Sequence, residues 1–245
     1  MPRTRISVCC PDRGDAPARI DLITGMLAPR LISRTRRTAR VGITAAQMLL
    51  LEGDDVELDI EVDAGCSLQV QDTGGTVAYP PRERPADQPG DVEPSRWSTS
   101  IRLGEGAALS WNGLPLVVSQ GAVTLRRTTA HLSEGARLLM RETVVLGRHG
   151  ETGGRVTSAL SVSDAHGPVL LEETSLDGLA PRPGILGRRR VLDSVVCAGF
   201  SPETAAGDLV FDRPGAMART IGDDAHRTAL DERMRQWEAE MQLRD

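Results

Sequence analysis

A strand–turn–strand unit occurs three times in this chain and constrains its fold more than any other sequence feature. Residues 56–62 (VELDIEV) alternate apolar and acidic side chains, as a half-buried strand requires. A turn that ends at Gly65 follows, and a second alternation begins directly after it. Equivalent units place their turn glycines at Gly106 and Gly135. Glycine suits a tight turn because it adopts positive φ without steric cost. The pattern predicts repeated β-hairpins.

The remaining strand signals extend this pattern over most of the chain. Further strands are expected at residues 156–162, 169–176 and 191–198, each bounded by Gly, Pro or Asp. The three turn glycines are 41 and 29 residues apart, and this unequal spacing favours repeated hairpins over a strict solenoid repeat. We therefore predict one all-β domain over residues 1–245, with layered antiparallel sheets and a few short helices.

Two late segments have helical signals, and one earlier segment reads as a loop. Residues 212–219 are compatible with one or two helical turns, and residues 228–242 are predicted to form a C-terminal helix that begins at a capping box. Its apolar stripe packs on the protein itself or forms a partner-binding surface, and both remain open. The candidate partner-binding residues are Leu230, Met234, Trp237 and Met241. Residues 80–95 hold five prolines and read as a surface loop within the domain.

Charge is unevenly distributed and argues against nucleic acid as a partner. Residues 1–50 contain nine arginines and three aspartates, whereas the whole chain has a net charge of −5. This distribution favours a protein partner or an intramolecular pairing, and six aromatic rings are too few for base stacking. The chain has no lysine, which excludes a phosphate-binding or Schiff-base lysine. It also lacks an apolar run that suits a signal peptide or membrane span, so we expect a cytoplasmic protein.

The cysteines and histidines predict no tightly bound metal or cofactor. Cys9, Cys10, Cys66 and Cys197 have no C-x-x-C spacing, and adjacent cysteines rarely bridge each other. All four are therefore predicted to be reduced thiols. The four histidines are not spaced as metal ligands on one element.

The common catalytic motifs are absent from the sequence. It has no H-E-x-x-H, no G-x-S-x-G and no G-x-G-x-x-G after a strand. Glu172 and Glu173 are neighbours on a predicted strand, so their side chains face opposite sides and cannot act as an acid–base pair. We predict that the protein is not an enzyme.

Several stretches together resemble the UreD (UreH) family of urease accessory proteins. They are residues 49–62, residues 72–79 and, most specifically, residues 111–148, with a weaker match at residues 185–193. The resemblance covers roughly residues 22–222. It implies an all-β scaffold that assembles with UreF and the GTPase UreG on apo-urease. That assembly promotes nickel insertion and carbamylation of the urease active-site lysine.

The family resemblance also implies a polar interior passage that carries nickel in transit. Carboxylates and hydroxyls would hold such a cation weakly, unlike a Cys/His cage. The candidates are polar residues within otherwise apolar strand patterns: Asp72, Thr73, Thr76, Glu142, Thr143 and Glu172. Each can instead be a hydrogen-bonded core or surface group. For Glu142, the apolar surroundings predict either a functional role or a pairing with Arg141 or Arg148.

Two other functions remain open at this stage. A β-sandwich ligand-binding module, for instance for carbohydrate, predicts an aromatic patch in a groove, which six rings disfavour. A hydrolase would need two carboxylates that converge from different strands, which the arrangement of the strands decides.

Overall fold

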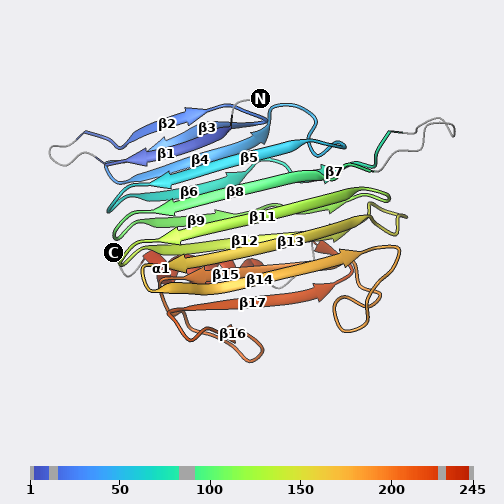
Figure 1. The fold of residues 1–245 in the computed structure, drawn as a ribbon. Helices are drawn as coiled ribbons and strands as arrows, with labels where there is room; N and C mark the ends of the chain where they lie inside the picture. Colours follow the sequence, from blue (N-terminus) through green and yellow to red (C-terminus); the bar gives the residue numbers. More distant parts are fainter. Residues whose placement is uncertain (1–2, 11–15, 83–91, 226–229, 243–245) are drawn as a thin grey trace.

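Two β-sheets stack face to face, and one helix packs on the outside of the second sheet (Figure 1). The computed structural model describes residues 3–10, 16–82, 92–225 and 230–242. Sheet A has the order β14 (Gly167–Asp177), β13 (Arg155–Asp164), β11 (Val123–Leu132), β8 (Ser95–Leu103), β5 (Asp55–Val62), β1 (Thr4–Cys9) and β2 (Arg19–Ile23). The prediction of an all-β fold with a C-terminal helix is confirmed.

Sheet B lies opposite sheet A and contains ten strands. Its main path has the order β16 (Leu209–Val210), β17 (Gly215–Gly222), β15 (Val191–Ala198), β12 (Arg137–Leu146), β9 (Ala108–Asn112), β6 (Ser67–Asp72), β4 (Thr38–Ala45) and β3 (Leu27–Arg34). Two short strands, β7 (Thr76–Ala78) and β10 (Leu116–Val118), pair with each other, and β10 also pairs with the C-terminal half of β12.

The glycine turns join the two sheets and do not form hairpins, so this part of the prediction is wrong. Strands β5, β8 and β11 lie in sheet A, whereas the strands that follow them, β6, β9 and β12, lie in sheet B. Successive units therefore pair in parallel: β5 with β8 and β8 with β11 in one sheet, β6 with β9 and β9 with β12 in the other. A turn between sheets lets the apolar sides of both strands face each other and form the core.

The three turns stack on one another at one end of the molecule. Gly65, Gly106 and Gly135 all have positive φ, at 65°, 61° and 67°. The Gly65 amide donates to the Glu105 carbonyl at 2.8 Å, and the Gly106 amide donates to the Glu134 carbonyl at 2.9 Å. The unit is therefore a coil, and its unequal spacing comes from the chain length between the strands, since β7 ends at Ala78 and β8 begins at Ser95, whereas β10 ends at Val118 and β11 begins at Val123. Most of the segment 80–95, predicted to be a surface loop, lies outside the described residues.

Antiparallel strands flank the parallel coils on both sides. Strands β1 and β2, and likewise β3 and β4, pair antiparallel at the N-terminal side, while β13–β14 and β12–β15–β17 do so at the C-terminal side. The chain colours in Figure 1 run in order down this stack. A core of aliphatic side chains fills the space between the sheets, as the scarcity of aromatic residues requires.

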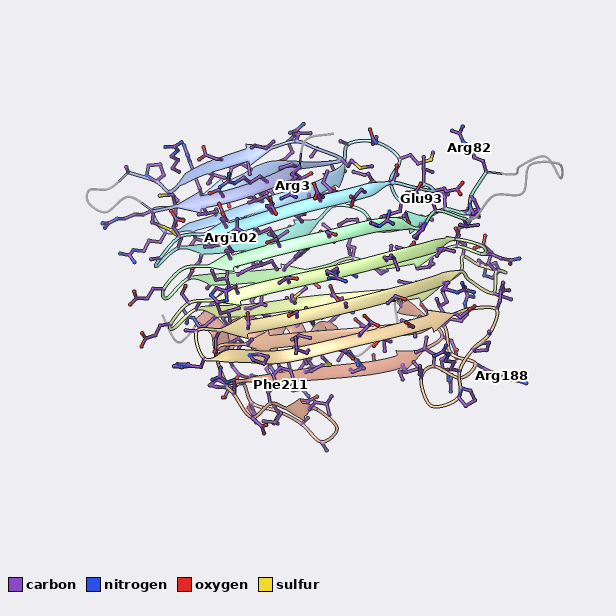
Figure 2. All side chains as sticks on the ribbon, viewed as in Figure 1. Arg3, Arg82, Glu93, Arg102, Arg188 and Phe211 are labelled. Atoms are coloured by element: carbon purple, nitrogen blue, oxygen red, sulfur yellow. A yellow bond between two sulfur atoms is a disulfide. The ribbon has the colours of Figure 1, made fainter. Side chains whose placement is uncertain are left out.

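Two of the N-terminal arginines, Arg3 and Arg5, pair with acidic residues of the chain. Strand β1 pairs with the acidic strand β5 in sheet A, and the charged side chains of both strands lie on the outer face of this sheet (Figure 2). The Arg3 guanidinium lies 2.8 Å from the Glu57 carboxylate, and both Arg5 and Arg102 pair with Glu61. These pairs hold the pKa of Glu61 below its usual value. For these arginines, the intramolecular pairing expected from the charge distribution is confirmed.

The C-terminal helix α1 (Leu230–Gln242) covers the outer face of sheet B. The four candidate partner-binding residues Leu230, Met234, Trp237 and Met241 are buried against residues of β12, β15 and β17. They are thus covered by the protein itself in this structure, which is one of the two alternatives that the sequence left open. The capping-box residue Thr228 lies outside the described residues. Among the described residues, no helix combines the length and apolarity of a membrane span.

The segment 212–219, predicted to be helical, forms a bend at residues 212–214 and the start of β17 from Gly215 onward. Met217 faces the core between the sheets, whereas Ala216 and Ala218 face α1. Both faces of the strand are covered by apolar residues here. Its sequence therefore lacks the alternation of apolar and polar residues by which a strand is recognised.

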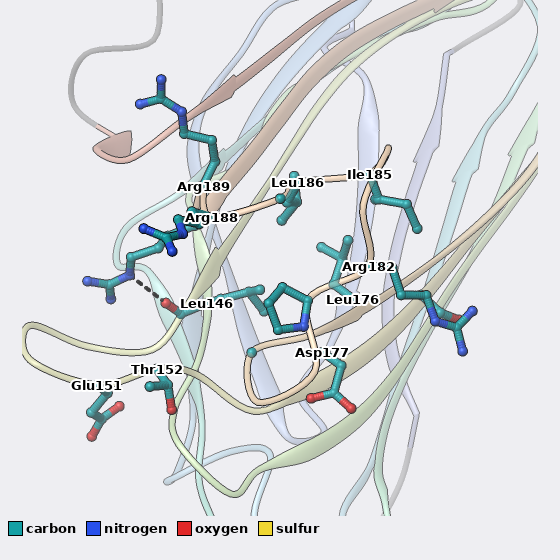
Figure 3. A pocket seen from close by; sticks show the side chains of 15 residues that line it. Leu146, Glu151, Thr152, Leu176, Asp177, Arg182, Ile185, Leu186, Arg188 and Arg189 are labelled. Atoms are coloured by element: carbon teal, nitrogen blue, oxygen red, sulfur yellow. Dashed lines mark hydrogen bonds between the residues drawn. The ribbon is translucent and has the colours of Figure 1, made fainter.

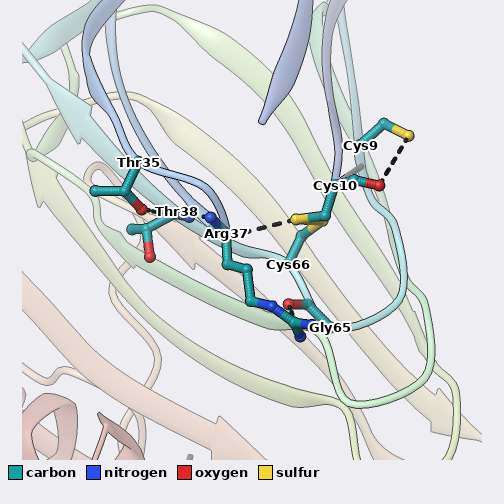
Figure 4. The surroundings of a disulfide bond; sticks show 7 residues. All are labelled: Cys9, Cys10, Thr35, Arg37, Thr38, Gly65 and Cys66. Carbon is teal, nitrogen blue, oxygen red and sulfur yellow. Dashed lines mark hydrogen bonds between the residues drawn. A yellow bond between two sulfur atoms is a disulfide. The ribbon is translucent and has the colours of Figure 1, made fainter. Parts of the chain in front are cut away.

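A disulfide bond joins Cys10 and Cys66, contrary to the prediction of four reduced thiols (Figure 4). Cys9 and Cys10 are adjacent at the end of β1, and only Cys10 faces the turn where β6 begins. Its partner lies 56 residues away, a distance in sequence that no spacing motif reports. Cys9 and Cys197 are not disulfide-bonded, and burial raises the pKa of Cys197 to about 12.

Candidate functional site: a polar row between the sheets

A row of polar side chains crosses the inner face of sheet B. In the ladder register, Glu142 on β12 pairs with Ser194 on β15, which pairs with Arg219 on β17. Residues opposite each other in a ladder point to the same face of the sheet. Asp72 continues this row on the other side, because it and Glu142 each directly follow a residue that pairs with Asn112.

Sheet A presents a matching set of polar residues to this row. Glu172 on β14 is in register with Leu160 on β13 and Thr128 on β11. The neighbouring inward row contains Thr174, Ser158 and Arg126 on the same three strands. The apolar core is therefore interrupted by a polar band that involves both sheets.

Glu142 lies at the centre of this band and bridges the two sheets. Its Oε1 lies 2.9 Å from Nη2 of Arg126 and accepts a hydrogen bond of 3.1 Å from the Thr128 hydroxyl. The Arg126 and Glu142 side chains are each only 12% exposed. The expected pairing of Glu142 with Arg141 or Arg148 is wrong. Alternation places Arg141 on the opposite face of β12, and Arg148 pairs with Glu151.

Asp72 ends β6 where the strand is interrupted before β7. One carboxylate oxygen accepts a hydrogen bond from the Trp111 indole at 3.0 Å, and the other accepts one from the Leu114 amide at 2.9 Å. Burial nevertheless raises the pKa of Asp72, and the two hydrogen bonds and the more distant Arg126 guanidinium only partly offset it.

Glu172 ties β14, the edge strand of sheet A, to β17 of sheet B. Arg219 contacts both of its carboxylate oxygens, with Nη2 at 2.8 Å from Oε2, and donates a 2.8 Å hydrogen bond from Nε to the Ser194 hydroxyl. The hydrogen bonds from Arg219 lower the pKa of Glu172. A cavity of about 30 Å³ separates Glu172 from Glu142, which is room for about one water molecule.

The other three candidates do not join this band in the same way. Thr143 faces α1 and donates a 2.8 Å hydrogen bond to Asp193, within a buried pair between that aspartate and Arg141. Thr73 donates to the backbone carbonyl of Ile43 at 3.1 Å. Thr76 faces the interior one row away from Asp72 and Glu142, in register with Leu116.

Sequence reasoning missed the basic partners Arg126 and Arg219. For Arg126 a signal was available, because stepping back by twos from the inward residues Leu132 and Ala130 reaches Thr128 and then Arg126. Arg219 carried no such signal, since its segment was read as helical. Glu172 and Glu173 do face opposite sides, as predicted, with Glu173 exposed.

The chemistry of this band is that of neutralised carboxylates. Glu142 and Glu172 each have an arginine, so a cation that binds either one must displace a guanidinium. In the described part of the chain, no three His, Cys, Asp or Glu side chains come together as a metal site.

Comparison with known proteins identifies the family. Residues 50–239 match the model of the UreD urease accessory protein family. The chain is 34% identical to urease accessory protein UreD 1 of Streptomyces griseus over 81% of its own length and 76% of that protein. It is 32% identical to UreD 3 of the same organism over 92% and 93%. A UreD of Streptomyces coelicolor is 31% identical over 82% and 80%. The chain therefore belongs to the UreD family of urease accessory proteins.

Proposed function

We propose that this protein is a maturation scaffold that assembles with a UreF-like protein and a UreG-like GTPase on apo-urease and promotes nickel insertion. Membership in the UreD family supports a role in urease maturation. In this proposal nickel is cargo in transit, and the scaffold itself performs no catalysis. The assembly would act in the cytoplasm, where the Cys10–Cys66 disulfide would be exposed to reducing thiols.

The polar band between the sheets is the observation that supports the nickel part of this proposal. Asp72, Glu142 and Glu172 lie in one interior band of a core that is otherwise aliphatic. Burying three carboxylates is costly unless each has a partner, and apolar side chains of similar size would form the same core. Their hard oxygen atoms, and the arginine partners of Glu142 and Glu172, suit a cation that binds briefly and leaves.

Substitution of Glu142 gives the sharpest test, because its effect on nickel transfer can be separated from its effect on the stability of the protein. A Glu142→Gln variant leaves Arg126 buried without its carboxylate, which lowers the free energy of unfolding. The double variant Arg126→Gln/Glu142→Gln removes both charges and is expected to recover part of that stability. In purified urease activated together with UreF and UreG, we expect both variants to lower nickel content by about tenfold, as for groups that support a bound metal.

The controls decide between a role in metal transfer and a structural role. Glu173→Gln, on the outer face of the same sheet, should leave the nickel content of urease unchanged. If the double variant restores nickel content along with stability, the carboxylate serves only to neutralise Arg126, and the proposed role of the band is wrong.

A further inference from the structure

The connection between β14 and β15 carries a concentrated positive charge. Residues 178–192 contain four arginines and no aspartate or glutamate. The segment folds back over the end of the sheets and encloses a cavity of about 320 Å³ (Figure 3). In Figure 2 its Arg188 lies at the opposite end of the molecule from Arg102.

The floor of this cavity is aliphatic and its rim is basic. Leu146, Leu176 and Leu186 line the floor, and all three are buried. Arg182 and Arg188 line the cavity on either side of these leucines (Figure 3), and both are exposed. The cavity thus combines an apolar lining with two exposed guanidinium groups.

The acidic residues at the opening are already engaged elsewhere. Glu151 accepts a 2.9 Å hydrogen bond from Nε of Arg148. Asp177 accepts one of 3.1 Å from Nε of Arg155, and its other oxygen caps the backbone amide of Leu179 at 2.9 Å. Neither carboxylate therefore neutralises the arginines of residues 178–192.

Two of the four arginines are also engaged. Arg190 donates to the backbone carbonyls of Leu146 at 2.9 Å and Gly147 at 2.6 Å, and Arg189 pairs with Asp223. Among the described residues, the guanidinium groups of Arg182 and Arg188 make no hydrogen bond or ion pair. The cavity therefore has two guanidinium groups available for a ligand.

We propose that this cavity docks an acidic segment of a partner protein, in which an aliphatic side chain is flanked by carboxylates. A guanidinium binds a carboxylate through two parallel hydrogen bonds, and the leucine floor would bury the aliphatic side chain. Nucleic acid fits less well, because no aromatic side chain lines the cavity for base stacking. Free phosphate would leave the apolar floor without a function. This inference does not depend on nickel transfer.

Binding of a designed peptide to the full chain tests the proposal. The probe is a fluorescein-labelled peptide with two leucines flanked on each side by two glutamates, followed by fluorescence anisotropy. We expect saturable binding that the double variant Arg182→Glu/Arg188→Glu weakens by at least about tenfold, because each charge-assisted hydrogen bond contributes about that factor. Peptides with glutamine in place of glutamate, or serine in place of leucine, should also bind about tenfold more weakly.

A matched control separates local docking from general charge attraction. Arg36→Glu/Arg127→Glu makes the same change in net charge at two exposed arginines outside the cavity and should leave peptide affinity within about twofold. The proposal is overturned by any of three results: no binding to the wild-type chain, equal weakening by the control variant, or full displacement of the peptide by inorganic phosphate.

Discussion

At the scale of single residues, the polar band shows that similar carboxylates in one core behave differently. Burial dominates at Asp72 and raises its pKa, since its two direct donors, Trp111 and Leu114, are uncharged. At Glu172 the hydrogen bonds from Arg219 dominate and lower the pKa. The charge of the nearest donor therefore accounts for the opposite directions of the two pKa shifts.

This difference predicts an unusual pH dependence for Asp72. A carboxyl group whose pKa is raised on folding stabilises the folded state below its unfolded pKa, and this contribution is lost as the pH rises through the folded value. The free energy of unfolding of the wild type relative to Asp72→Asn should therefore increase as the pH falls from neutral toward the ordinary value of 3.8. Urea denaturation of both proteins across this range measures the difference.

A matched variant, Glu172→Gln, should show the opposite dependence of the stability difference on pH. Glu172→Gln removes a carboxyl group whose pKa is lowered on folding, so the advantage of the wild type over this variant should shrink as the pH falls through that lowered value. If both differences change in the same direction with pH, the pKa of Asp72 is not raised.

The residue scale also shows what the sequence could predict of the site. Asp72, Glu142 and Glu172 were recognisable because a charge stands out in an apolar strand pattern. Their partners were harder to recognise, since Arg126 and Arg127 are adjacent and only one of them faces inward. Alternation along the strand shows that Arg126 is the residue that faces inward. Which residue it contacts in the other sheet depends on the register of the strands, which the local sequence does not encode.

At the scale of elements, the glycine turns show where prediction from sequence stopped. Alternating strands and a positive-φ glycine at Gly65, Gly106 and Gly135 were correctly predicted. A hairpin and a turn between sheets share both features, because each reverses the chain between two half-buried strands. The backbone hydrogen bonds between successive turns distinguish them, and these join residues far apart in sequence.

Helix α1 is fixed to sheet B by an ionic contact as well as by its apolar stripe. Arg141 pairs with Asp193 at 2.8 Å and also with Asp231 in the first turn of the helix. These partners raise the pKa of Arg141 and keep it charged. The helix is therefore an integral part of the domain.

Truncating Trp237 should accordingly destabilise the whole protein. Its side chain is fully buried, and its indole donates a 3.0 Å hydrogen bond to the Glu203 carbonyl. Trp237→Ala should lower the free energy of unfolding by about 3–5 kcal/mol, as large core truncations do. Chemical denaturation measures this, with Val210→Ala, which is 69% exposed, as a control that changes little. An unchanged stability with lost binding of UreF would instead assign the stripe to a partner.

At the scale of the whole molecule, the parallel coils need covers at both ends of the stack. An uncovered parallel strand leaves a row of unpaired amide and carbonyl groups that another chain could pair with. Here antiparallel strands from both ends of the sequence supply the covers. The first 45 residues provide four of these strands, although the arginines of this segment hide the alternation of its apolar residues.

The disulfide fastens one of these covers to the first coil. It joins residues separated by 56 positions, and closing a loop of that length stabilises a fold by about 4 kcal/mol on the chain-entropy estimate. Reductant should therefore lower the urea midpoint of the wild type to that of Cys10→Ser. Cys9→Ser should keep the response to reductant, whereas loss of that response would mean that Cys9 forms the bond.

Stacking of the turns has a consequence for how the molecule gains and loses order. In the backbone, each coil is hydrogen-bonded to the layers on either side of it, so a large part of its folding free energy comes from contacts with neighbouring layers. Order can then spread through the stack layer by layer, much as a zipper closes. A defect in one layer is then felt first by the layers directly beside it.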